Sequence, residues 1–354
     1  MPHVKGEMAK VLQVSDFLEK SKSIPVIDVR SPGEYGYAHI PGALSLALFS
    51  DEERAAIGTL YKRSGRIKAV QKGLDFVGPK LAEFTKYALS LKCEELLLHC
   101  WRGGMRSSSM AWLLERVGIE CYLLENGYKS YRNHILSCFE KPLKIILLGG
   151  YTGSGKTDLL HLLEESGEQV LDLERLANHK GSAFGALGEG PQPGTEFFEN
   201  LIFDKLSALD QTKSIWIEDE GRSVGRNTVP TGLWQQMRDA PLVQIEVPFE
   251  IRLKRLLRDY GNEPREELVN SIQKIEKRLG FDNCKAAVEA CLSGDIGRAA
   301  EICLIYYDRA YAKKLTERFD GERARFKKIV PLDKEVSKES VSELLKAAEI
   351  FTKD

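Results

Sequence analysis

The sequence predicts two α/β domains in one chain, each built on a parallel sheet. The chain has 354 residues, which is long for one ordinary domain and comfortable for two. Short apolar runs alternate with amphipathic helical patterns before and after Pro142, as expected for parallel strands joined by crossover helices. Pro142 breaks helices and follows two charged residues, so we place the domains at 1–140 and 141–354.

In the N-terminal domain, three apolar runs predict buried strands, at residues 25–29, 96–99 and 121–124. Amphipathic patterns at 80–91 and 107–117 predict helices in the same stretch of chain. Because strands and helices alternate, we expect a parallel sheet covered by helices.

The second domain starts with a new apolar run, at 143–148, directly after the proline. Further strands are predicted at 169–173, 214–217 and 242–247, again separated by helical patterns. From about residue 264 onward the pattern is almost entirely helical, charged and amphipathic. We therefore expect a second α/β domain with a helical C-terminal part.

The composition favours a globular cytoplasmic protein. Hydrophobic residues make up 43% of the chain, which is enough to bury real cores. The 51 Lys and Arg against 52 Asp and Glu exclude a polycation that coats nucleic acid, but they allow a local basic groove. The first ten residues lack the apolar core of a signal peptide, and no apolar run is long enough to span a membrane. The seven cysteines form no CxxC pair and the histidines lack ligand spacing, so we expect free thiols and no zinc.

A cysteine lies between a predicted strand and a predicted helix. After Cys100, two glycines allow a tight loop, and the serines at 107–109 can cap the helix that follows. Loop amides and the helix dipole would favour the thiolate of Cys100, which we predict to be the catalytic nucleophile. The predicted anion-binding loop consists of Trp101, Arg102, Gly103, Gly104, Met105 and Arg106, whose two arginines add positive charge. A buried structural cysteine is the alternative, and we retain it for the other six thiols.

A phosphate-binding loop follows the first strand of the second domain. The segment 150–157 fits the pattern G-x-x-x-x-G-K-[ST] in full and leads into an apolar-periodic helix, which is the context that the motif requires. The predicted phosphate ligands are Gly150, Thr152, Gly153, Ser154, Gly155, Lys156 and Thr157. Lys156 would contact the terminal phosphate, and Thr157 would hold a Mg²⁺ ion.

Acidic residues at later strand ends are candidates for holding that Mg²⁺ ion. Asp172 and Glu174 follow one predicted strand, and Glu218, Asp219 and Glu220 follow another. Solvated turn residues are the alternative for each acid. Arg222 and Arg226 follow the second group and could clamp an anionic ligand, whereas Arg252 and Arg255 share a helix face that is either a phosphate contact or a solvated surface.

The N-terminal domain resembles the rhodanese family. The resemblance rests on residues 26–35 and 39–43, which precede the Cys100 loop by the family's distance, and it covers about 10–138. It implies a rhodanese-like fold in which Cys100 carries the transferred atom. The loop departs from the sulfur-transferring pattern because five residues, rather than four, separate Cys100 from Arg106. A loop of this length is similar to that of rhodanese-related phosphatases, so chalcogen transfer and the handling of a phosphate-sized anion both stay open.

A rhodanese domain followed by a phosphate-loop domain resembles the tRNA 2-selenouridine synthase family. The supporting segments are 51–63, 100–107, 125–128, 177–185 and 218–225. The resemblance implies a tRNA-modifying transferase that acts on 2-thiouridine at the wobble position of the anticodon. Geranyl diphosphate would alkylate the sulfur, and selenium from selenophosphate would then replace the geranylthio group.

Within that scheme, Cys100 would either take selenium as a perselenide or attack the geranylated intermediate. The phosphate loop would hold a diphosphate, that of geranyl diphosphate, rather than only ATP, and we expect no tightly bound organic cofactor. Two alternatives stay open on the sequence alone. One is a fusion of a rhodanese-type phosphatase or sulfurtransferase with a nucleotide kinase, and the other is a nucleotide-gated tRNA-binding module.

Overall fold

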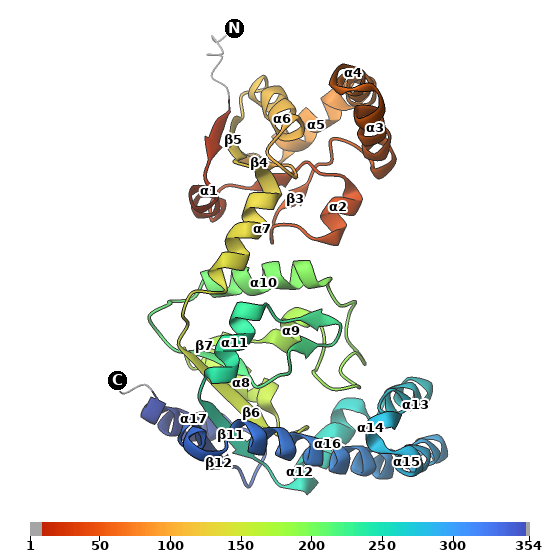
Figure 1. Cartoon of the computed structure of the whole chain (residues 1–354), viewed down its shortest axis with the longest axis vertical. Coiled ribbons are helices and arrows are strands. Elements are labelled where there is room, and N and C mark those ends of the chain that lie inside the picture. The colour runs from red at the N-terminus through yellow and green to blue at the C-terminus, as the bar shows by residue number, and fades with distance from the viewer. Residues whose placement is uncertain (1–8, 352–354) are drawn as a thin grey trace. The chain divides into compact units, whose positions relative to one another are not determined.

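The computed structural model describes residues 9–351. The first eight residues belong to the stretch that was expected to lack a signal peptide, and they lie outside the described residues. The chain forms two compact units that divide between Cys138 and Phe139 (Figure 1). Each has its own parallel sheet, which confirms the predicted α/β class.

The N-terminal unit is a parallel sheet with helices on both faces. Its strands are β1 (Lys10–Leu12), β2 (Val26–Asp28), β3 (Leu44–Ser45), β4 (Glu95–His99) and β5 (Glu120–Leu124), in the order β1-β5-β4-β2-β3. Its helices are α1 (Val14–Ser21), α2 (Pro32–Tyr37), α3 (Asp51–Ser64), α4 (Arg66–Val77), α5 (Leu81–Ser90), α6 (Met105–Glu115) and α7 (Gly127–Cys138). Figure 1 shows α5 and α6 on the face opposite α1 and α7.

The core of this unit explains why these segments fold as they do. Leu96 and Leu98 on β4 pack against Phe84 of α5 and Met110 of α6, and all four side chains are buried. The apolar residues of β4 point to both faces because the strand is central and covered on both sides. The carboxyl end of β4 therefore lies in the middle of the sheet, where a loop can be supported from two neighbouring strands.

The second unit has a parallel sheet in the order β12-β11-β6-β8-β7. Its strands are β6 (Ile145–Gly150), β7 (Gln169–Leu171), β8 (Ile215–Glu218), β11 (Leu242–Glu246) and β12 (Lys327–Pro331), and β9 (Ser223–Val224) with β10 (Asn227–Thr228) forms a separate hairpin. Its helices are α8 (Lys156–Glu165), α9 (Leu173–Ala177), α10 (Thr195–Ser207), α11 (Thr231–Asp239), α12 (Phe249–Tyr260), α13 (Arg265–Lys274), α14 (Glu276–Leu279), α15 (Phe281–Ser293), α16 (Ile296–Arg318) and α17 (Lys338–Ala348).

Two apolar cores sandwich this sheet. One joins it to α10, α11 and the end of α16, through Phe198, Leu233 and Leu315. The other joins it to α8 and α17, through Leu160 and Leu344. A third core, in the helical region from α12 to α16, is separate from the sheet and includes three buried cysteines: Cys284, Cys291 and Cys303.

The expectation of an almost entirely helical chain after residue 264 was wrong in one respect. Residues Lys327–Pro331 form β12, which pairs in parallel with β11 and adds an edge to the sheet. The strand escaped notice because it has only five residues and starts with two lysines. An edge strand needs few apolar side chains, so its sequence carries a weak signal.

Candidate active sites at two strand-to-helix loops

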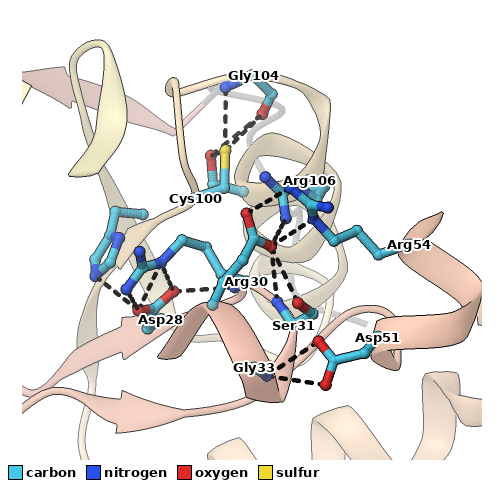
Figure 2. A network of polar contacts seen from close by, with 12 residues as sticks. Asp28, Arg30, Ser31, Gly33, Asp51, Arg54, Cys100, Gly104 and Arg106 are labelled. Atoms are coloured by element: carbon cyan, nitrogen blue, oxygen red, sulfur yellow. Dashed lines mark hydrogen bonds and ion pairs between the residues drawn. The ribbon is translucent and has the colours of Figure 1, made fainter. Parts of the chain in front are cut away.

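The first candidate site is the loop from β4 to α6, which holds Cys100. Cys100 is only 3% exposed, and its Sγ accepts hydrogen bonds from the Gly104 amide and the Ser107 hydroxyl, both at 3.3 Å (Figure 2). Gly104 is the N-cap of α6, so the amide comes from the positive end of the helix dipole. The expectation that Ser107 caps the helix was wrong: it lies inside the first turns of α6 and points at Sγ instead.

The surroundings of Cys100 favour its thiolate. Burial raises the pKa of this thiol, but the hydrogen bonds from Ser107 and Gly104 and the charge of Arg106 outweigh burial, so its pKa lies below the ordinary value. Burial raises the pKa values of Cys121 and Cys303 to about 12. Cys100 is thus distinguished from these two buried thiols by a thiolate that the protein stabilises.

The two arginines of the loop are placed differently. Arg106 forms an ion pair with Glu34 at 2.7 Å, so its charge is neutralised by the protein rather than left free for a ligand (Figure 2). Burial raises the pKa of Glu34, but Arg106, the Ser31 amide and Arg54 together lower it to about 2. Arg102 is exposed. Of the other predicted loop residues, Trp101 is half-buried, and Gly103, Gly104 and Met105 are exposed.

A buried ion pair lies behind Cys100 and was not foreseen from the sequence. Arg30 and Asp28 are both buried, and the guanidinium donates to the carboxylate at 2.6 Å and lies over the ring of Tyr128 at 3.9 Å. His99 is fully buried nearby, and burial lowers its pKa to about 4, so it is neutral. An Asp-x-Arg sequence at a strand end is the only local signal for this pair, and it does not predict burial.

A tight turn before α7 fixes the Cys100 loop from the other side. Asn126 and Gly127 both have positive φ, of 55° and 61°. The Tyr128 amide then donates to the Cys100 carbonyl at 2.8 Å. A Cβ on Gly127 would lie 2.3 Å from that carbonyl oxygen, so only glycine fits there. The segment 125–128 entered the sequence analysis only through the family resemblance, and the structure supplies its physical role.

The second candidate site is the loop from β6 to α8. Gly153 and Gly155 take positive φ values of 77° and 82°, as the strand-loop-helix context of the motif requires. Lys156 Nζ donates to the Gly150 carbonyl at 3.0 Å, and the Ser154 hydroxyl is buried without a hydrogen-bond partner. The loop therefore forms a cradle in which the Ser154 hydroxyl is unused, whereas Lys156 Nζ is held by the loop's own backbone.

Three acids gather next to this cradle. The Thr157 hydroxyl donates to Glu174 at 3.2 Å, the Glu174 amide donates to Glu218 at 2.7 Å, and the carboxyl groups of Glu174 and Glu220 are hydrogen-bonded. Burial, followed by the charge of Glu220, raises the pKa of Glu174 to about 8. Burial and the charges of Asp172 and Glu174 likewise raise the pKa of Glu218, one of whose oxygens has no partner.

The other acids proposed for Mg²⁺ have structural partners. Asp172 Oδ1 caps α9 by accepting from the Arg175 amide at 2.8 Å, whereas its Oδ2 is buried without a hydrogen-bond partner. Asp219 pairs with Arg318 at 2.6 Å and accepts from the Tyr311 hydroxyl at 3.3 Å. Among residues 9–351, no group of three or more His, Cys, Asp or Glu side chains is arranged to bind a metal ion by itself.

The structure places the two arginines that were predicted to clamp an anionic ligand in different surroundings. Arg222 lines a cavity of about 330 Å³, together with Asp219, Trp234 and Arg238. Arg226 instead donates to the backbone carbonyls of Gln192 and Pro193 and does not reach the phosphate loop.

For Arg252 and Arg255, the interpretation as a solvated helix face was wrong. Both side chains are buried against the phosphate loop, because Asp308 and Asp158 neutralise them. Arg252 also donates to the Thr152 carbonyl at 3.1 Å, which ties α12 to the loop.

An apolar cavity opens beside the phosphate loop. Its volume is about 60 Å³, and its wall includes Thr152 of the loop. The rest of the wall comes from the helical region and the segment before α10, and includes Phe184, Leu256, Leu257, Leu268, Ile272, Ala299 and Leu304. No helix within the described chain is long and apolar enough to cross a membrane.

Comparisons with known proteins agree with this two-site architecture. A model of the rhodanese-like domain matches residues 11–134, and a model described as the tRNA 2-selenouridine synthase AAA domain matches residues 143–328. The chain is 36% identical over 282 residues to tRNA 2-selenouridine synthase of Pseudomonas putida strain F1, with 73% of this chain and 75% of that protein covered.

Two further relatives carry the same name. The protein of Proteus mirabilis is 33% identical, with 84% of this chain and 90% of that protein covered. The protein of Sulfurovum sp. NBC37-1 is 36% identical, with 80% and 83% covered. Because these relatives are at least 30% identical to the chain and cover more than two thirds of it, the chain belongs to the tRNA 2-selenouridine synthase family.

Proposed function

We propose that this chain converts wobble 2-thiouridine of tRNA into 2-selenouridine in two steps that use different units. Geranyl diphosphate alkylates the sulfur at the phosphate loop, and selenium from selenophosphate then replaces the geranylthio group at the Cys100 loop. All seven cysteines are free, which supports a reducing, cytoplasmic setting.

The observation that carries this proposal is the apolar cavity beside the phosphate loop. Thr152 belongs both to the loop and to the cavity wall, so one ligand can place a diphosphate in the loop and an apolar chain in the cavity. Each methylene buried there would contribute about 0.8 kcal/mol. The base and ribose of ATP would leave their polar groups unpaired against leucine and phenylalanine side chains, at a cost of about 1–3 kcal/mol each.

In the first step, the sulfur of 2-thiouridine attacks the first carbon of the geranyl chain. A carbon–sulfur bond forms, the carbon–oxygen bond to the diphosphate breaks, and the ring nitrogen releases its proton to solvent. Lys156 and the loop amides lie where they would stabilise the negative charge that develops on pyrophosphate.

The acids beside Thr157 fit a Mg²⁺ ion that binds together with the diphosphate. A Glu218 oxygen is buried without a partner, and the raised pKa of Glu174 reflects crowding of carboxylates that a cation would relieve. Such an ion is normally held by one or two carboxylates and by substrate phosphates, so Thr157 and Glu174 would suffice. When bound, it would supply positive charge to the leaving pyrophosphate.

In the second step, electron balance selects one role for Cys100. Selenium in selenophosphate is already at the selenide level, so transfer to Cys100 as a perselenide would require an oxidant. We therefore assign the Cys100 thiolate to attack the ring carbon that carries the geranylthio group, which leaves as geranylthiolate and takes a proton from solvent. Selenophosphate then attacks the same carbon and displaces Cys100, and water cleaves the selenium–phosphorus bond to release phosphate.

Mass spectrometry of nucleosides from thiolated tRNA tests the division of labour. With both co-substrates, Lys156→Ala should lose geranylation by about 10²-fold or more, because the leaving group loses its cation. Cys100→Ala should instead accumulate S-geranyl-2-thiouridine. The opposite pattern, with geranylation lost in Cys100→Ala and intact in Lys156→Ala, would sink the assignment. Hydrolysis of p-nitrophenyl phosphate that depends on Cys100, with tRNA left unchanged, would favour the phosphatase–kinase alternative.

A further inference from the structure

The hairpin formed by α3 and α4 concentrates positive charge in a chain that is almost neutral. The hairpin, residues 51–77, contains six basic and four acidic side chains, which gives +2 against −1 for the whole chain. The acids lie at its base, at 51–53 and 75, and residues 54–74 contain the six basic side chains and no acidic one. The basic residues are Arg54, Lys62, Arg63, Arg66, Lys68 and Lys72. Figure 1 shows the two helices side by side.

The structure gives three of these six charges a partner: Arg54 pairs with Glu34, Lys72 pairs with Asp75 at 3.6 Å, and Arg66 contacts Met105. No residue of α3 is buried, and Lys62, Arg63 and Lys68 are exposed and make no hydrogen bond or ion pair with any other residue in the range 9–351. Arg66 and Lys68 also stand in the first turn of α4, where positive charge opposes the helix dipole. Lys62 and Arg63 lie in the last turn of α3, where the helix dipole favours positive charge. Only the charges at the start of α4 are unfavourable, and an external polyanion would relieve them.

The hairpin is anchored beside the Cys100 loop. At its base, Arg54 pairs with Glu34 at 3.0 Å, and the same Glu34 pairs with Arg106 of the loop at 2.7 Å (Figure 2). Asp51 accepts from the Gly33 amide at 3.0 Å, which joins α3 to α2. Near the turn between the two helices, Arg66 reaches the sulfur of Met105 at 3.7 Å, and Met105 is the first residue of α6. Contacts at both ends hold the basic surface next to the nucleophile.

We propose that the α3–α4 hairpin docks the phosphate backbone of the RNA substrate and thereby delivers a nearby nucleotide to Cys100. The proposal rests on the proposed function only in taking tRNA as the substrate. Exposed cations on long flexible side chains suit a row of phosphates. Tyr61, 58% exposed and adjacent to Lys62 and Arg63, adds an aromatic face for an unpaired base. This chemistry favours RNA over an anionic membrane, which would gain nothing from proximity to a buried thiolate.

Charge reversal at three positions tests the docking surface in the full chain. Lys62→Glu, Arg63→Glu and Lys68→Glu are combined, and the Kd for tRNA is measured over a series of salt concentrations. We expect the affinity at 0.1 M salt to fall by about 10²-fold or more and the salt slope to drop by about 2 to 3, since each lost phosphate contact removes roughly 0.7 to 0.9.

A matched variant controls for net charge. Lys86→Glu, Lys277→Glu and Lys338→Glu reverse three exposed lysines elsewhere and should leave the salt slope unchanged. The rate of Cys100 alkylation by iodoacetamide reports whether the N-terminal unit is intact, and it should be the same in both triple variants.

The outcomes separate this inference from the proposed function. If the wild-type chain modifies thiolated tRNA but the hairpin variant binds it with the affinity and salt slope of the control variant, the inference is overturned. If the hairpin variant loses binding to vesicles containing phosphatidylserine while its tRNA binding is unchanged, the surface docks a membrane and RNA docking is wrong. If the wild-type chain binds no tRNA at any salt concentration, the proposed function fails, and the inference falls with it.

Discussion

The two strand-to-helix loops of this chain handle negative charge in opposite ways. At the Cys100 loop the anion belongs to the protein, and Gly104 and Ser107 already donate to it, so its pKa is lowered in the absence of any ligand. At the phosphate loop the anion must arrive from outside, and the acids around Thr157 have raised pKa values because they are buried together. The protein already stabilises the thiolate of the first loop, whereas the carboxyl groups beside the second loop repel one another, and a bound cation would relieve that repulsion.

The loops also differ in what supports them. The backbone of the 126–127 turn is packed against the Cys100 loop, and α7 amides bind its carbonyls. The phosphate loop is supported by the side chains of Arg252, Arg255 and Tyr311, and by backbone at Gly153, where a Cβ would lie 2.9 Å from the Arg252 carbonyl oxygen. A loop supported by backbone can hold one geometry, whereas a loop supported by side chains can adjust when its ligand binds. The predictions below test this difference, first for the backbone and then for the charges.

The largest expected effect is that of a methyl group on the rigid loop. Gly103 has a φ of 61°, and a Cβ there would lie 2.8 Å from the Asn126 amide nitrogen and 2.9 Å from the Leu124 carbonyl oxygen. Gly155 has a φ of 82°, but its Cβ would meet the guanidinium of Arg255. Both substitutions to alanine carry the positive-φ cost of about 1–2 kcal/mol, and Gly103→Ala adds a backbone clash. We expect Gly103→Ala to destabilise its unit by about 3 kcal/mol or more, and Gly155→Ala by less.

Hydrogen-exchange mass spectrometry of the full chain measures this difference, because it reports the opening of each unit separately. Gly36→Ala serves as the control, since a Cβ at that helical glycine meets no atom within 4 Å. Equal loss of protection in the Gly103→Ala and Gly155→Ala variants would show that the two loops are equally rigid, contrary to the comparison.

The same contrast explains which parts of the molecule the sequence could predict. The central strands β4, β6 and β8 were placed to within two residues, because buried parallel strands are continuous apolar runs. Both loops were recognised because glycines at fixed spacing mark a backbone geometry that few other residues can adopt. Local pattern was sufficient wherever the structure depends on neighbouring residues.

Local pattern failed wherever a distant partner decides the outcome. Arg252 and Arg255 have the spacing of a solvated helix face, but they are buried because Asp308 and Asp158 neutralise them across the fold. Serine is a common helix cap, but the Ser107 hydroxyl donates to Cys100 Sγ instead, because the fold brings the two side chains together. The neighbouring residues in the sequence do not indicate which group each of these side chains contacts.

A smaller effect is expected from removing one of the crowded acids. The pKa of Glu174 is about 8 in the folded chain against an ordinary 4.5, so the folded state binds more protons than the unfolded state between these values. Stability must then fall as pH rises through that window. We expect Glu174→Gln to stabilise the second unit at pH 8.5 by about 1 kcal/mol, or a few degrees in unfolding midpoint, and to have little effect at pH 4.

Thermal unfolding with and without Mg²⁺ and pyrophosphate checks this expectation. The variant should also lose part of the stabilisation that these ligands give the wild-type chain, because Glu174 is one of the proposed ligands. Glu165→Gln, at an exposed position on α8, is the matched control and should change neither quantity. If Glu174→Gln instead lowers the midpoint at pH 8.5, the acids are not in repulsion and the contrast between the loops is lost.

The smallest effect is expected at the hydroxyl that completes the Cys100 loop. In Ser107→Ala, burial and the Gly104 amide stay but one donor to Sγ is gone, so the pKa of Cys100 should rise. The rate of iodoacetamide alkylation as a function of pH measures this shift directly. Ser108→Ala is the control, because that hydroxyl bonds to the Gly104 and Met105 carbonyls and not to Sγ. Ser107→Thr keeps a hydroxyl and should restore the profile. If the alkylation rate of Ser107→Ala depends on pH as in the wild-type chain, the amides at the start of α6 are sufficient to stabilise the thiolate. The Ser107 hydroxyl would then contribute nothing to the difference between the two loops.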